Sequence, residues 1–138
     1  MSIILLSGQP NTGKTTTINL VYDELIRQGA LVKKKKKQLG NNKMDFECVL
    51  EYQNKIIAIY SMGDDHRLCE RAVKTYRNCN FLILAYSAKK TSQCKLYNAT
   101  AKDTMNLIIN KTVDNTDEAK MEKANKKDST TILSSIIK

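Results

Sequence analysis

Several features are missing from this 138-residue sequence, and each absence excludes a class of protein. No apolar run approaches the roughly 20 residues that a membrane-spanning helix requires, so we expect no membrane partner. The first residues lack the basic region and the longer apolar stretch of a secretory signal. The four cysteines show neither a C-x-x-C pair nor a zinc-ligand spacing. Free thiols without a signal favour a cytoplasmic protein.

Acidic residues are also scarce relative to basic ones. The chain has 23 Lys and Arg against 14 Asp and Glu, a formal charge of +9. Such a surplus favours a polyanionic partner, which can be a nucleotide or a nucleic acid. Five consecutive lysines, Lys33–Lys37, predict an exposed strand end or loop. No aromatic residues interleave this run, which weakens the case for stacking on single-stranded nucleic acid.

One motif near the N-terminus carries most of the functional information. An apolar run, Ile3–Leu6, precedes it and a helical pattern follows it. The motif reads G-x-x-x-x-G-K-T and consists of Gly8, Gln9, Pro10, Asn11, Thr12, Gly13, Lys14 and Thr15. Glycines let the backbone N–H groups converge on one point, and the helix adds its positive end there. The order of strand, glycine loop and helix is the context that a phosphate-binding loop requires.

This motif resembles the Walker A loop of the P-loop nucleoside-triphosphate-binding proteins. The resemblance implies that the loop holds the phosphates and that Lys14 reaches the β- and γ-phosphates. It also implies that the Thr15 hydroxyl helps to coordinate Mg²⁺. Thr16 is a further candidate contact, to the α-phosphate.

Two acidic residues are the candidates for the metal side of the site. The apolar run Lys55–Tyr60 predicts a strand, and Asp64 and Asp65 follow it closely. Because strand ends border the ligand crevice of an α/β sheet, Asp64 is predicted to contact Mg²⁺ through water. Asp65 is predicted to orient the attacking water. Either residue has an alternative role as the N-cap of the next helix.

The predicted fold is a single α/β domain, a P-loop-like three-layer sandwich. Its sheet is expected to have five mostly parallel strands, with one antiparallel strand supplied by a hairpin that turns at Gln53–Asn54. Helices are expected over about 14–28 and 65–78, with a last strand over 105–110. Residues 115–128 read as an exposed polar loop or helix. Ser129 is expected to cap a C-terminal helix that runs through residues 129–138.

The resemblance leaves three functions open. The first is Mg²⁺-dependent binding of a nucleoside triphosphate with hydrolysis of the β–γ bond. The second is a small P-loop kinase with the loop 89–93 in place of a lid; the third is a non-enzymatic, nucleotide-switched nucleic-acid-binding or assembly factor. The segment Asn110–Asp114 nearly matches the guanine-reading N-K-x-D motif of GTPases, but its aspartate comes one residue late. This mismatch favours ATP over GTP. A protein partner or homo-oligomer is the remaining expected partner.

Overall fold

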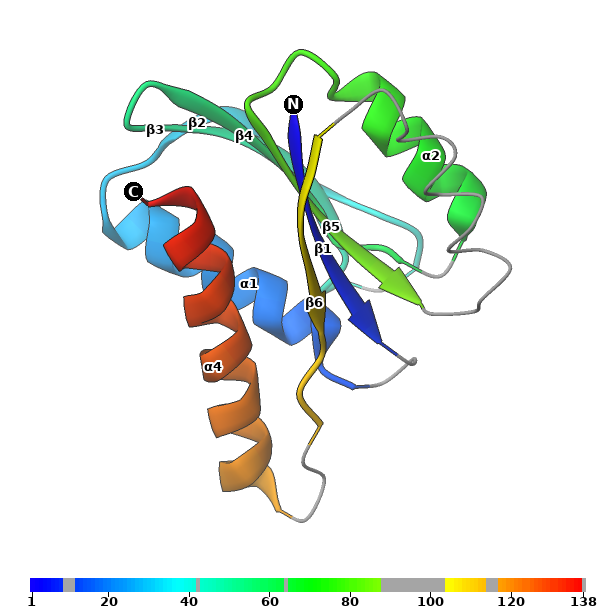
Figure 1. The fold of residues 1–138 in the computed structure, drawn as a ribbon, viewed down its shortest axis with the longest axis vertical. Coiled ribbons are helices and arrows are strands. Elements are labelled where there is room, and N and C mark those ends of the chain that lie inside the picture. Colours follow the sequence, from blue (N-terminus) through cyan, green and yellow to red (C-terminus); the bar gives the residue numbers. More distant parts are fainter. Residues whose placement is uncertain (9–11, 42, 64, 88–103, 114–116, 138) are drawn as a thin grey trace.

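The part of the chain that the structure describes forms a six-stranded mixed sheet with helices on both faces (Figure 1). The computed structural model describes residues 1–8, 12–41, 43–63, 65–87, 104–113 and 117–137. Within these residues the strands are β1 (Ser2–Gly8), β2 (Leu31–Gln38), β3 (Phe46–Tyr52), β4 (Lys55–Tyr60), β5 (Phe81–Ser87) and β6 (Thr104–Asn110). The helices are α1 (Lys14–Arg27), α2 (His66–Thr75) and α4 (Glu118–Ile136).

The strand order is β2-β3-β4-β5-β1-β6. Strands β4, β5, β1 and β6 pair in parallel, whereas β3 is antiparallel to both of its neighbours. This arrangement confirms the α/β class and the single antiparallel hairpin strand. The expected number of five strands is wrong, because the segment that contains the lysine run forms a sixth strand at the edge of the sheet.

Two apolar layers hold the helices to the sheet. On one face, the buried side of α1 (Ile18, Val21 and Leu25) packs with Ile132 and Ile136 of α4 against β1, β3 and β4. On the other face, α2 contributes Cys69, Ala72, Val73 and Tyr76 to a second layer. Figure 1 shows α1 and α4 on one side of the sheet and α2 on the other. Strands β1 and β5 are apolar along nearly their whole length because helices cover both faces of the sheet at these strands.

The hairpin between β3 and β4 turns through Gln53 and Asn54, which have φ values of 51° and 63°. Two consecutive positive φ values give the turn the twist that tight antiparallel hairpins prefer. The register pairs Glu47 with Tyr60 and Tyr52 with Lys55. Consequently the amino end of β3 lies at the same edge of the sheet as the carboxyl end of β4.

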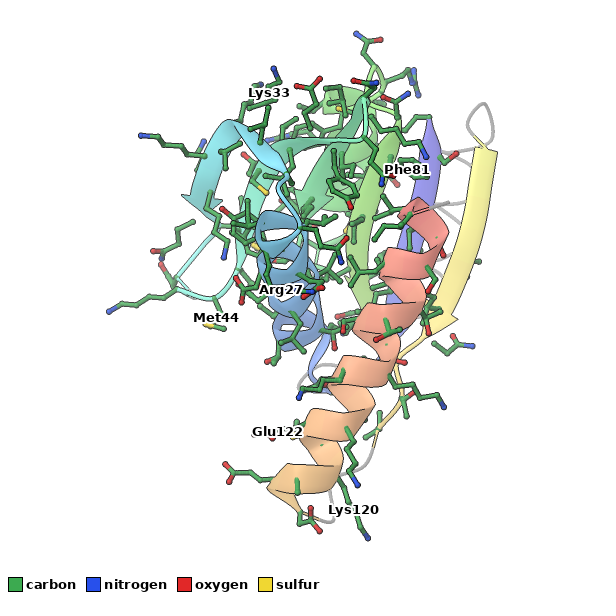
Figure 2. The ribbon with its side chains drawn as sticks, turned by 90° about the vertical axis from the view of Figure 1, so that its left-hand side faces the viewer. Arg27, Lys33, Met44, Phe81, Lys120 and Glu122 are labelled. Atoms are coloured by element: carbon green, nitrogen blue, oxygen red, sulfur yellow. The ribbon has the colours of Figure 1, made fainter. Side chains whose placement is uncertain are left out.

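The C-terminal helix begins at Glu118, well before Ser129. Asp117 caps it, because its carboxylate accepts the backbone N–H of Lys120 at 2.7 Å. The polar segment 115–128 is therefore largely helical from residue 118 onward, and its exposure is uneven: Ala124, Asn125 and Asp128 are buried. Figure 2 shows Lys120 and Glu122 pointing outward from the first turns of α4. Among the described helices, none is both long and apolar enough to cross a membrane.

Candidate functional site

The carboxyl ends of the parallel strands meet around the start of α1. Gly8 at the end of β1 is in register with Ser87 at the end of β5, and Ser7 with Asn110 at the end of β6. Of the predicted phosphate loop, the structure describes Gly8 and residues 12–16, whereas Gln9, Pro10 and Asn11 lie outside the described residues. Gly13 stands directly before α1 with φ of 90°, a conformation that only glycine adopts readily.

The Lys14 side chain is folded back over the strand ends. Its exposed fraction is only 8%, and its ammonium donates to the Gly8 carbonyl oxygen at 2.7 Å and to the Ser87 hydroxyl at 3.3 Å. The cation is thus fixed between the carboxyl ends of β1 and β5, where the loop begins. A buried ammonium beside a helix N-terminus is a favourable place for an anion.

Thr15 has a carboxylate partner that sequence reasoning missed. Its hydroxyl donates to Asp45 Oδ1 at 2.9 Å, and the Ser61 hydroxyl lies 3.3 Å from the same oxygen. Asp45 is buried, with 8% of its surface exposed. Hydroxyl and carboxylate oxygens are the ligands that Mg²⁺ accepts alongside water and phosphate. Thr15 and Asp45 therefore offer two oxygen ligands of the kind that could hold a magnesium ion.

The hairpin brings Asp45 to this place. Because β3 is antiparallel to β4, the residue just before β3 lies beside the residue just after β4, which is Ser61. Phe46 N–H donates to the Ser61 hydroxyl at 2.8 Å and fixes this junction. Asn19 joins α1 to the segment before β3, since its amide donates to the carbonyl oxygens of Thr15 in α1 and of Met44.

Of the two acidic residues predicted at the site, Asp64 and Asp65, the structure describes only Asp65. Asp64 lies outside the described residues, so its predicted metal contact stays a prediction. The Asp65 carboxylate accepts the backbone N–H of Arg67 at 2.9 Å and caps α2, which is the alternative role considered above. Its side chain is 40% exposed, and its orientation of water remains a prediction.

The segment before Asp65 is held close to β5. A Cβ atom at Gly63 would lie 2.6 Å from the backbone of Ala85, so only glycine fits there. Gly63 O accepts the backbone N–H of Ser87 at 2.9 Å. The chain after β4 is thereby fixed beside the residue whose hydroxyl contacts Lys14.

The helix α4 supports the loop from the opposite side. A Cβ atom at Gly13 would come within 2.5 Å of Asn125 Oδ1, so the loop and α4 are in close contact. Thr17, in the first turn of α1, donates its hydroxyl to Gly13 O at 2.8 Å. Asn125 is 5% exposed. Asn125 Oδ1 also lies 3.4 Å from Thr17 Oγ1, and the sequence offered no signal for this contact because the two residues are 108 positions apart.

A buried ion pair lies at the end of β6. The Lys111 ammonium is 3.0 Å from Asp128 Oδ2, and the two side chains are 0% and 4% exposed. Asp128 also accepts the backbone N–H and the hydroxyl of Thr112. Lys111 is the lysine of the near match to N-K-x-D, and its burial in this pair gives it a structural role.

The described residues contain no cluster of three or more His, Cys, Asp or Glu side chains that could hold a metal by themselves. The loop 89–93, a candidate lid in the kinase alternative, lies outside the described residues. Comparisons with known proteins found no matching family model, no matching curated protein and no matching solved structure.

Proposed function

We propose that this protein binds the Mg²⁺ complex of a nucleoside triphosphate, preferentially ATP, and hydrolyses its β–γ bond. The observation that carries the proposal is the placement of Lys14 and Thr15. One is a buried ammonium at the start of α1, and the other is a hydroxyl bonded to the buried carboxylate of Asp45. Together they bring one cation and one metal-ligand pair to the same helix terminus, as binding of a Mg²⁺-triphosphate requires.

The roles follow from the contacts. The Lys14 ammonium can exchange its bond to Gly8 O for phosphate oxygens, because both acceptors lie at the loop. The Thr15 hydroxyl and the Asp45 carboxylate would hold Mg²⁺, which neutralises phosphate charge when bound. Asp45 thus joins Asp64 as a metal candidate, and Asp65 keeps its predicted role toward water. The preference for ATP is supported by Lys111, whose burial with Asp128 removes it from any role in reading guanine.

Calorimetric titration with ATP, with and without Mg²⁺, tests this proposal. We expect Lys14→Ala to weaken binding about 100-fold, because it removes charge-assisted hydrogen bonds to phosphate worth roughly 3 kcal/mol. Asp45→Asn should bind ATP equally with and without Mg²⁺, since an amide keeps the contact to Thr15 but is a poor metal ligand. The matched control is Lys35→Ala, which removes the same charge from the exposed strand β2 and should bind like the wild type.

Wild-type affinity in Lys14→Ala would refute the binding assignment. Phosphate release by the wild type tests the second half of the proposal separately. If the wild type binds ATP but releases no phosphate when no acceptor is present, the hydrolase function is rejected. ADP formation that depends on an added alcohol or nucleoside would replace it by the kinase. GTP serves as the comparison for base preference.

A further inference from the structure

A cavity lies on the α2 face of the sheet, opposite α1. It measures about 350 Å³ and is lined by residues from the end of β2, from β3, from β4 and from α2. This volume is within the range of small-ligand sites, which is roughly 300–1,000 Å³. Three of the residues that line it, Tyr60, Ala72 and Tyr76, are buried. The half-buried side chains of Leu39, Met62 and Leu68 make part of its wall apolar.

Two exposed cations face this cavity from different elements. Lys37 comes from β2 and Arg71 from α2. Within the part of the chain that the structure describes, neither forms an ion pair. The carboxylate that lines the same cavity, Glu47, accepts the Tyr76 hydroxyl at 2.9 Å. The lining therefore carries a net positive charge next to an apolar wall.

The tyrosines complete the polar part of the lining. Burial is the first cause that raises the pKa of Tyr60, to about 12, and burial also raises the pKa of Tyr76. Both phenols keep their protons at neutral pH. A negative charge on the ligand would therefore meet Lys37 and Arg71 without opposition from a tyrosinate.

Two other lysines of β2 have partners outside the cavity, which favours a small ligand over a nucleic acid. Lys33 pairs with Glu51 at 2.9 Å, and Lys36 donates to Asn19 on the other face of the sheet. Neither lines the cavity. The two tyrosines that line the cavity are buried, so they offer no exposed ring for stacking of bases. Cations at one cavity, rather than along a groove, suit a compact anion.

We propose that this cavity binds a small organic anion, with its phosphate or carboxylate between Lys37 and Arg71 and its apolar body against Leu39, Met62 and Leu68. The inference does not rest on the proposed nucleotide site, but the two are connected. Leu39 N–H donates to Asp45 O at 2.9 Å. Met62 precedes Gly63, whose carbonyl holds Ser87 beside Lys14. A ligand in the cavity would thus contact both segments that position the nucleotide site.

Phenyl phosphate is the probe for the test, since it combines a dianion with an apolar ring. Titration of the full chain, followed by amide chemical shifts in NMR, should give a dissociation constant of about 1–5 mM, as expected for a fragment of this size. The largest shifts should fall on residues that line the cavity. Phenylacetate distinguishes a carboxylate from a phosphate as the preferred group, and inorganic phosphate and phenol should each bind more weakly than the complete probe.

Matched variants decide the location. Arg71→Ala and Lys37→Ala should each weaken phenyl phosphate binding about tenfold. Lys74→Ala and Lys35→Ala, on the same helix and strand but outside the cavity lining, should change it less than twofold. Equal losses in all four variants would indicate a diffuse polyanion-binding surface and would overturn the inference, as would an absence of saturable binding.

Lys14→Ala separates this inference from the proposed function. Binding of the probe should survive this substitution, because Lys14 does not line the cavity. Loss of binding in Lys14→Ala, with full binding in Arg71→Ala, would place the probe in the phosphate loop. That result would reject the second site while leaving the nucleotide site supported.

Discussion

Lysines have opposite roles in two regions of this protein. At the carboxyl edge of the parallel strands, Lys14 and Lys111 are 8% and 7% exposed, and each is held by oxygen atoms at fixed positions. On β2, at one edge of the described sheet, lie Lys33–Lys37, and every residue of this strand is exposed. Figure 2 shows Lys33 on the side of the molecule formed by β2.

The difference shows that the number of lysines in a segment does not predict how much each lysine contributes to stability. In the low-dielectric interior each electrostatic contact is stronger, and a cation left without its partner is far more costly. On the surface, water and salt screen each lysine, so its removal changes little. The two single lysines should therefore matter more than the run of five.

The run has a physical role of its own. Among the described strands, β2 is the outermost on its side and pairs only with β3, so no described strand pairs with its other edge. Leu31 and Val32 are also exposed there, to 62% and 45%. Lysines on such an edge discourage pairing with strands of other molecules.

Removing the partner of the buried lysine is the strongest test of this contrast. We expect Asp128→Ala to lower the free energy of unfolding by about 3–5 kcal/mol, because it leaves the Lys111 ammonium buried without its carboxylate. Urea denaturation followed by circular dichroism measures this change. The double variant Lys111→Met with Asp128→Leu should recover most of the loss, because no charge stays buried. A loss below about 1 kcal/mol in Asp128→Ala would show that water reaches Lys111.

The contact between the loop and α4 should have the next largest effect. We expect Gly13→Ala to destabilise the protein by about 2–3 kcal/mol, from its positive φ and from the collision with Asn125. Gly29→Ala is the matched control, since φ there is 98° and nothing lies within 4 Å of the added atom. It should cost only the backbone term of about 1 kcal/mol. Equal unfolding free energies for the two variants would mean that α4 moves away from the loop without cost.

Much of the fold could be predicted from the sequence because its signals are local. The apolar runs of β1 and β5 and the stripe of α1 each specify an element without reference to the rest of the chain. Strand β2 lacks such a signal, since both of its faces are exposed and lysines repeat without alternation. Its strand conformation comes from backbone pairing with β3, which no periodicity in residues 31–38 reveals.

The candidate site also contains residues with a local sequence signal and residues that only the fold brings together. Lys14 and Thr15 follow from a contiguous motif, so the sequence alone predicts them. Asp45 was missed because its place depends on the register of the hairpin, which sets the start of β3 beside the end of β4. The one local signal was an aspartate directly before the first strand of the expected hairpin. Asn125 and Asp128 have no such signal, since only the packing of α4 brings them to the loop and to β6.

Within the lysine run itself, the contrast predicts a small but measurable inequality. The Lys36 ammonium donates to Asn19 Oδ1 at 3.0 Å and lies 4.1 Å and 4.3 Å from the ring centres of Tyr22 and Phe46. We expect Lys36→Ala to lower the free energy of unfolding by about 1 kcal/mol, since it removes this cation–π contact between β2 and α1. Lys35→Ala, an exposed neighbour of equal charge, should stay within about 0.5 kcal/mol of the wild type. If urea denaturation gave the same value for both variants, the lysines of β2 would act only through their total charge, and the position of each along the strand would carry no energetic meaning.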